Sequence, residues 1–207
     1  PMLEPADSSE CKEFTKLAYS LSEEYDTPVV LRLTTRISHS RSLVELCDRE
    51  EHELIPYQKD PAKNVMLPAF AKKKHPMVEE RTAALTKWAE SSEINRIELN
   101  DTSIGIIAAG ACYQYAKEAM GENASYLKLG MIHPLPVDLI KRFAEKVDTL
   151  YVIEELDDII ETHCRKNGIP VIGKDLFPRC GEFNQQLIRE LLTGEKLSRK
   201  ALKEEIP

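Results

Sequence analysis

The chain has 207 residues, of which 42% are hydrophobic, enough to build one large or two small packed domains. Its formal net charge of −7 argues against general binding to nucleic acid or to an anionic membrane surface. No apolar run approaches the roughly 18 residues of a membrane-spanning helix, and no signal peptide precedes the first expected helix. We therefore expect a cytoplasmic protein with no nucleic-acid or membrane partner.

The five cysteines are scattered along the chain and include no CxxC pair. Zinc ribbons and locally held iron–sulfur clusters need closely spaced cysteines, so neither is expected here. An odd number of scattered thiols is typical of an intracellular protein that keeps them reduced. The histidines lack a second ligand at metal spacing, so we expect no metal site in this chain.

Residues 1–42 are expected to contain one helix and one or two strands. Apolar side chains recur at helical spacing through residues 10–24, and residues 7–10 match a capping box at the start of that helix. The β-branched run at residues 29–35 predicts a strand. Because so few elements cannot bury a core, this segment either docks on the rest of the chain or is the trailing part of a preceding domain.

Residues 43–101 predict an extended, charged connection that four prolines interrupt. One helix is expected within it, at residues 76–90, with Pro76 in its first turn and apolar side chains on one face. A connection of this length is uncommon inside a compact protein, so we expect it to wrap over a neighbouring surface.

Residues 102–193 alternate between strand-like and helix-like patterns. The expected strands are 103–110, 125–130, 149–154 and 169–172, and the expected helices are 111–120, 137–147, 157–166 and 183–192. Strands that alternate with helices predict an α/β fold with an open, mostly parallel sheet and helices on both faces. Residues 194–207 form a charged tail that is expected to fray.

Gly105 and Gly110 have the spacing of a phosphate-binding loop, but Ala111 and Cys112 stand where such a loop carries lysine and serine or threonine. A nucleotide site of that type is therefore not expected. Two interpretations of Gly110 stay open. It permits a tight turn from strand to helix, or the helix that follows offers its free N–H groups to an anion.

Glu154 and Glu155 close the third expected strand and precede Asp157 and Asp158. Adjacent carboxylates in a cleft divide acid and base roles when their environments separate their pKa values. The simpler interpretation is that their negative charge stabilises the start of the following helix, by roughly 0.3–1 kcal/mol. Both interpretations stay open.

His133 lies just beyond the second expected strand, where ligands of open parallel sheets gather. It either contacts a ligand or packs in a turn beneath the prolines that follow. Residues 34–40 form a polar run in which Arg36 is suited to bind a carboxylate or phosphate, and Ser38 or His39 to reach a ligand. The alternative for this run is a turn rich in capping residues.

Several segments resemble the alpha subunit of indolepyruvate ferredoxin oxidoreductase, a thiamine-diphosphate 2-oxoacid ferredoxin oxidoreductase. They are MLEPADS at residues 2–8, TPVVLR at 27–32, TTRISHS at 34–40, LKLGMIHPLP at 127–136, YVIEEL at 151–156 and GKDLFP at 173–178. They follow the family's order through nearly the whole chain. The resemblance implies a transketolase C-terminal-like domain at residues 102–193, preceded by the trailing segment of a pyrimidine-binding-type domain at residues 1–42.

In that family, aryl pyruvates are converted to acyl-CoA with thiamine diphosphate, Mg²⁺ and 4Fe–4S clusters, and electrons pass to ferredoxin. This sequence has neither a diphosphate motif nor a ferredoxin-like cysteine run. The resemblance therefore implies a non-catalytic central fragment, with no catalytic residue and no cofactor of its own, that serves assembly and the active-site rim. Its implied partners are the rest of the alpha subunit, a beta subunit and a second alpha copy, with ferredoxin and CoA for the whole enzyme.

Arg36, Ser38 and His39 match the family's TTRISH run, and with His133 and Glu154 they are the candidate rim residues. We also expect the chain to self-associate or to bind a partner subunit, because the apolar helix face of residues 10–24 is unused and the connection wraps outward. Two other functions stay open. One is a stand-alone module that binds a small ligand or anion at the helix start after Gly110, and the other is an enzyme that uses Glu154 and Glu155 as an acid–base pair.

Overall fold

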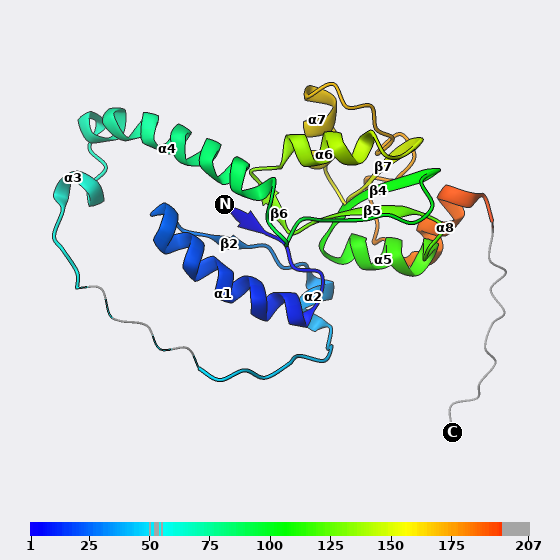
Figure 1. Cartoon of the computed structure of the whole chain (residues 1–207), viewed down its shortest axis with the longest axis horizontal. Coiled ribbons are helices and arrows are strands. Elements are labelled where there is room, and N and C mark those ends of the chain that lie inside the picture. The colour runs from blue at the N-terminus through cyan, green and yellow to red at the C-terminus, as the bar shows by residue number, and fades with distance from the viewer. Residues whose placement is uncertain (50, 52–53, 55, 196–207) are drawn as a thin grey trace.

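The computed structural model describes residues 1–49, 51, 54 and 56–195. Its centre is a four-stranded sheet in the order β3-β5-β4-β7 (Figure 1). The strands are β3 (Arg96–Glu98), β4 (Ile104–Ala109), β5 (Ser125–Leu129) and β7 (Thr149–Ile153). β4 pairs in parallel with both β5 and β7, and β3 joins β5 antiparallel at the edge. The expected open, mostly parallel sheet is therefore confirmed.

Helices cover both faces of this sheet, as the sequence predicts. The four are α5 (Gly110–Met120), α6 (Val137–Ala144), α7 (Ile159–Lys166) and α8 (Gln185–Thr193). Successive side chains of β4 point to opposite faces. Ile106 packs in one buried cluster with side chains of α5 and α8, whereas Ile107 packs in another with side chains of α6 and α7. The two hydrophobic faces of the sheet are thus each closed by a pair of helices.

A second, small sheet joins the beginning of the chain to its middle. It has the order β2-β1-β6, with β1 (Met2–Leu3), β2 (Val30–Leu31) and β6 (Met131–His133). β1 pairs in parallel with β2 and antiparallel with β6. The strand predicted at residues 29–35 is shorter than expected, because Thr34 ends the extended run and caps the short helix α2 (Thr35–His39).

Helix α1 (Ser8–Tyr25) begins where the capping pattern predicts. Asp7 accepts a hydrogen bond from the Glu10 backbone N–H (2.9 Å), and the Glu10 carboxylate accepts one from the Ala6 N–H (2.8 Å). The apolar face of this helix is not free for self-association, contrary to expectation. Phe14 and Leu21 are buried in a cluster with Leu3, Ala89 and Met131, which come from β1, α4 and β6. The face is occupied by this chain's own residues.

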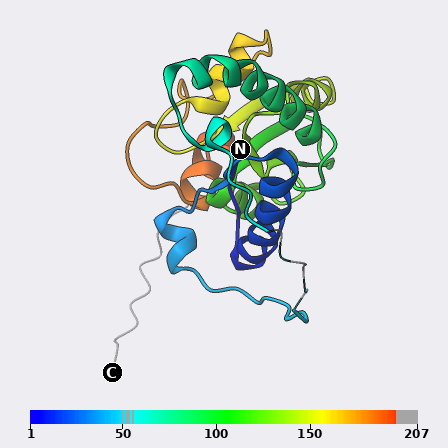
Figure 2. The ribbon, with the colours of Figure 1, turned by 90° about the vertical axis from the view of Figure 1, so that its left-hand side faces the viewer.

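The connection contains more regular structure than the sequence predicts. It holds α3 (Pro61–Asn64) and α4 (Pro68–Ala89), before edge strand β3. α4 was expected to begin at Pro76, but it begins at Pro68 and Pro76 lies inside it. Both prolines suit a first helical turn, so the pattern alone does not choose between them. The first half of α4 extends away from the body in Figure 1, and in the end-on view of Figure 2 the helix runs across the top of the molecule.

None of the helices in the described part of the chain is both long and apolar enough to cross a membrane. The five cysteines are free thiols, of which Cys112 and Cys164 are buried. Most of the tail expected at residues 194–207 lies outside the described residues.

Candidate functional site

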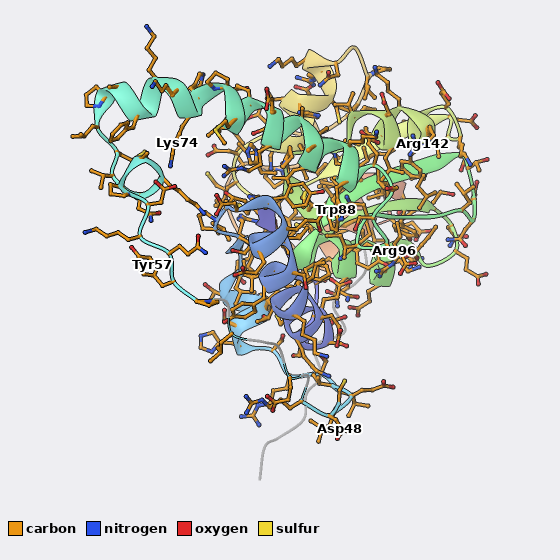
Figure 3. All side chains as sticks on the ribbon, turned by 60° about the vertical axis from the view of Figure 1, so that its left-hand side comes forward. Asp48, Tyr57, Lys74, Trp88, Arg96 and Arg142 are labelled. Carbon is orange, nitrogen blue, oxygen red and sulfur yellow. The ribbon has the colours of Figure 1, made fainter. Side chains whose placement is uncertain are left out.

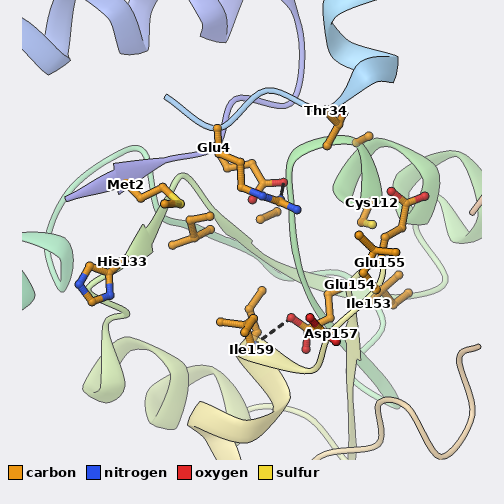
Figure 4. A pocket seen from close by; sticks show the side chains of 16 residues that line it. Met2, Glu4, Thr34, Cys112, His133, Ile153, Glu154, Glu155, Asp157 and Ile159 are labelled. Carbon is orange, nitrogen blue, oxygen red and sulfur yellow. Dashed lines mark hydrogen bonds and ion pairs between the residues drawn. The ribbon is translucent and has the colours of Figure 1, made fainter. Parts of the chain in front are cut away.

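A pocket of about 420 Å³ opens beyond the carboxyl ends of β4 and β7 (Figure 4). This is the edge where ligands of open parallel sheets bind. Its floor is apolar, from Ala109, Ile132 and Ile153 among others, and its carboxylate and guanidinium groups come from two parts of the chain. Glu4 and Arg32 enter from the small sheet, whereas the loop after β7 supplies the remaining carboxylates: Glu154, Glu155 and Asp157.

Glu4 and Arg32 form an ion pair inside the pocket, with 2.5 Å between Oε1 and Nη1. Glu4 is only 6% exposed. Burial raises the pKa of its carboxyl group above the ordinary value, although the Arg32 guanidinium acts in the opposite direction. The cation at the pocket wall is therefore already engaged by a carboxylate of this chain.

The carboxylate of Glu154 caps helix α7. Its two oxygens accept hydrogen bonds from the backbone N–H groups of Ile160 (2.9 Å) and Glu161 (3.0 Å). Burial raises the pKa of Glu154, and these two N–H groups partly oppose the shift. The geometry matches the simpler of the two sequence interpretations, in which negative charge stabilises the start of a helix.

Glu155 is also engaged, because its carboxylate accepts a hydrogen bond from the Phe183 N–H (2.8 Å), just ahead of α8. The two adjacent glutamates thus hold different backbone segments. They do not face one reacting atom as an acid and a base would. The interpretation of Glu154 and Glu155 as a catalytic pair gains no support from this arrangement.

The pocket rim combines exposed apolar side chains with a strained backbone. Leu156 has a left-handed φ of 63° and is 61% exposed, and Ile159 is 64% exposed. A left-handed conformation is unfavourable for leucine. Cys112 also lines the pocket, and burial raises the pKa of its thiol to about 12, so this group is protonated at neutral pH.

The start of helix α5 does not offer the anion site that was one interpretation of Gly110. Gly110 has a positive φ of 51°, as a tight strand-to-helix turn requires. A Cβ placed on it would lie 2.5 Å from Oε1 of Glu4. A carboxylate of this chain therefore lies against the helix start, where it would repel a bound anion.

Arg36 lines a second, adjoining pocket of about 320 Å³ with Tyr115 and Glu182. The two pockets share Arg32, Thr34, Glu155 and Leu156. Arg36 forms an exposed ion pair with Glu182 (2.5 Å). His133 and Glu154 line the first pocket, so the structure brings three of the five candidate residues to neighbouring hollows.

Ser38 and His39 line neither pocket. Both lie on α2, where the Ser38 hydroxyl donates to the Thr34 carbonyl (3.1 Å) and His39 is exposed. Thr34 caps this helix by accepting from the Ile37 N–H (3.3 Å). The run therefore has the capping-rich geometry that was its alternative interpretation.

Sequence reasoning missed Glu4 and Arg32, which form the only ion pair between side chains that line the first pocket in the described chain. The signal that pointed to them is weak: each is a charged residue directly after a short apolar strand. Their meeting depends on the parallel pairing of β1 with β2, and no local pattern encodes that pairing.

The described residues do not fit the cofactors that the resemblance implies for a whole enzyme. No group of three or more histidine, cysteine, aspartate or glutamate side chains in the described ranges is arranged to hold a metal ion. The first pocket carries four carboxylates and one arginine, a balance that disfavours a diphosphate. We therefore assign no cofactor chemistry to these residues.

Comparison with solved structures finds chains of a similar fold. The 2-oxoglutarate:ferredoxin oxidoreductase from Magnetococcus marinus matches with a TM-score of 0.64 and 16% identity. The match covers 93% of this chain and 41% of that one. At this identity the likeness establishes the fold. No protein-family model matches the chain.

Relatives in sequence identify the family of this chain. Indolepyruvate oxidoreductase subunit IorA is 38% identical in Archaeoglobus fulgidus, over 84% of this chain and 29% of the relative. IorA from Methanothermobacter thermautotrophicus is 34% identical, over 94% of this chain and 34% of the relative. IorA from Thermococcus kodakarensis is 37% identical, over 88% of this chain and 31% of the relative. This chain is therefore homologous to a segment of IorA, which confirms the resemblance, and it spans about a third of the length of these curated relatives.

Proposed function

We propose that this chain is a non-catalytic part of an indolepyruvate:ferredoxin oxidoreductase, in which it serves assembly and one rim of the active site. The observation that carries the proposal is the alignment with IorA at 34–38% identity over 84–94% of the chain. The catalytic carboxylate, the thiamine diphosphate and Mg²⁺ site, and the iron–sulfur clusters then belong to other parts of the enzyme. Aryl pyruvate, CoA and ferredoxin are the expected reactants of the whole.

The geometry of the first pocket supports the rim role. Its carboxylates Glu4, Glu154 and Glu155 are each held by this chain's own groups, so they shape the pocket without being free for chemistry. Leu156 and Asp157 are exposed at its edge. An exposed leucine in a strained conformation is more readily explained when a further surface contacts it. We infer that another domain or the beta subunit closes over this edge.

The test is to express the complete coding region around this segment, together with any subunit that copurifies. Indolepyruvate-dependent, CoA-dependent reduction of a viologen dye is the readout. We expect activity in the complete complex and none in the isolated 207-residue chain. Absence of activity with several aryl pyruvates in a complex that contains thiamine diphosphate and intact clusters would overturn the proposed reaction.

The rim role has its own control within the same complex. Asp157→Asn and Leu156→Ala are expected to change KM or kcat by about threefold or more, because a displaced rim misplaces the substrate. The matched variant is Glu145→Gln, which is also exposed but follows α6 at the opposite edge of the sheet. If all three variants have the KM and kcat of the wild-type enzyme, the rim role is wrong and only the assembly role is left.

A further inference from the structure

The first pocket lies where strands from both sheets end. Four of its lining residues stand at the carboxyl end of a strand: Glu4 after β1, Arg32 after β2, Ala109 at the end of β4 and Glu154 after β7. Ligands of parallel sheets bind beyond the carboxyl ends of the strands, and ligand sites occur preferentially between packed units of a protein. The volume of about 420 Å³ lies within the roughly 300–1,000 Å³ of small-molecule sites. Position and size therefore indicate a pocket for a small ligand.

Much of the wall of this pocket is aliphatic. Ile153 and Ile160 are buried, whereas Ile159 is 64% exposed (Figure 4). Asp48 and Tyr57 of the extended connection lie at the periphery of the molecule in Figure 3, and neither of them lines the pocket. An apolar group that enters such a pocket is removed from water, which is favourable in proportion to the apolar area that is buried. The wall therefore suits the apolar part of a ligand.

The carboxylates of the pocket need no partner from a ligand, but they repel an anion. Glu4 is paired with Arg32, with 2.5 Å between the two side chains. Glu154 accepts two backbone N–H groups and Glu155 accepts one. Their charges stay, and with Asp157 the lining holds four carboxylates against one guanidinium. Because charges interact more strongly in a protein than in bulk water, this excess of negative charge disfavours a second anion and leaves a neutral apolar group as the preferred occupant.

The aryl pyruvate of the proposed function has the same division between its two ends. Its aromatic ring is neutral and apolar, whereas its 2-oxo and carboxylate groups lie together at the other end. A pocket that admits the ring and repels the carboxylate keeps the reacting 2-oxo carbon at its mouth. Specificity is a difference of affinities, and charge repulsion lowers the affinity for the wrong ligand. A 2-oxoacid with a second carboxylate, such as 2-oxoglutarate, is anionic at both ends and should therefore be excluded.

We propose that the first pocket binds the aromatic side chain of the 2-oxoacid, and that the carboxylates of its lining exclude acidic side chains. Asp157, exposed at the edge of the pocket, is then a specificity-determining residue and not a catalytic one. The reaction itself rests on the proposed function. The assignment of the ring to this pocket rests on the aliphatic wall and on the excess of carboxylates.

Asp157→Lys tests the role of the charge in the complete protein with its copurifying subunits. The variant replaces an exposed carboxylate of the pocket by a cation. The kcat/KM for 2-oxoglutarate, divided by that for indolepyruvate, should rise about fivefold or more, because a repulsion becomes an attraction. Asp148→Lys is the matched control, since Asp148 is also exposed but precedes β7 at its amino end. If the ratio keeps its wild-type value in Asp157→Lys, or rises equally in Asp148→Lys, the role of the pocket charge is wrong.

Indole is the probe for the aliphatic wall, because it is the neutral ring without the 2-oxoacid group. Its binding to the same complex is measured by calorimetry, without turnover. Ala109→Leu places a larger side chain in the pocket and should weaken indole binding about tenfold or more.

Ile159→Gln is the second variant, and because Ile159 is 64% exposed it should fold even if Ala109→Leu does not. It should weaken indole binding about threefold, from the loss of apolar contact. Asp148→Lys again serves as the control. If indole does not bind to the complex, or binds the pocket variants as tightly as the wild type, the ring does not occupy this pocket.

The two readouts separate this proposal from the one it extends. A complex that oxidises indolepyruvate but shows no effect of the pocket variants on indole binding would refute the ring assignment and leave the proposed function standing. A complex that binds indole in this pocket but oxidises no aryl pyruvate would refute the proposed function and leave the preference of the pocket for an apolar ring.

Discussion

Removal of the Glu10 carboxylate should destabilise the protein strongly, because its partner is a fully buried ammonium. The Lys128 side chain is 0% exposed, and its Nζ lies 2.6 Å from Oε2 of Glu10 and 4.7 Å from the centroid of the Phe14 ring. Breaking a buried ion pair from one side costs about 3–5 kcal/mol, since the other charge stays buried without a partner. We expect Glu10→Ala to lower the free energy of unfolding by that amount.

The assay is equilibrium unfolding in urea, followed by the fluorescence of Trp88. This is the chain's single tryptophan, and it packs against the cluster that contains Phe14. Burial lowers the pKa of Lys128 although Glu10 opposes the shift. Because the unfolded state then binds the proton more tightly, stability should rise as the pH rises through the lowered pKa towards 10.5. Loss of Glu10 should lower the pKa of Lys128 further and so widen the pH range over which stability rises.

The matched background is Lys128→Met, which removes the buried charge and keeps an apolar chain of similar length. In that background Glu10→Ala should cost only about 1 kcal/mol, from the lost hydrogen bond to the Ala6 N–H and the lost, partly exposed ion pair with Arg96. A cost that is equal in both backgrounds, or below about 1 kcal/mol in the wild type, would refute the reasoning that the buried ammonium depends on Glu10.

Three further predictions concern single positions and are measured by the same unfolding assay. Glu154→Gln should cost about 1–2 kcal/mol, because an amide N–H₂ replaces one of the two oxygens that cap α7, and an unchanged midpoint would contradict the cap. Gly105→Ala should cost about 1–3 kcal/mol, because the new Cβ would lie 2.6 Å from Cγ2 of Val147. Gly121→Ala is the control for backbone strain, because its Cβ meets no atom within 4 Å but its φ is positive; if Gly105→Ala costs nothing, the overpacking argument is wrong. Leu156→Asn should stabilise by about 0.5–1 kcal/mol, because asparagine tolerates the left-handed φ of 63°, and a loss of stability would show that the leucine side chain contributes packing.

The sheet of residues 102–193 follows from the sequence because its strands are short apolar runs with sharp ends. β4 is apolar throughout and ends at Gly110, whose positive φ makes the turn. β3 was missed because Ile97 is its single apolar residue between two charged ones. It exists as a strand because it pairs with β5, and pairing of this kind is a tertiary effect.

The sequence predicted only those residues of the candidate site that lie at the ends of strands. Glu154 directly follows β7 and His133 is the last residue of β6, and both line the first pocket, near the edge that the rule for parallel sheets indicates. Glu4 and Arg32 reach the same pocket through the pairing of β1 with β2. Periodicity reports which face of an element is buried, but it does not report which distant segment lies against that face.

The small sheet sets an order of events during synthesis of the chain. β1 pairs with β2 about 30 residues later but with β6 only about 130 residues later, and protein synthesis adds about 5–20 residues per second. For roughly ten seconds, therefore, Leu3 and Phe14 have no β6 to pack against, although both are buried in the finished fold. A nascent chain in this interval exposes an unpaired strand edge and an apolar helix face, which is the kind of surface that chaperones bind.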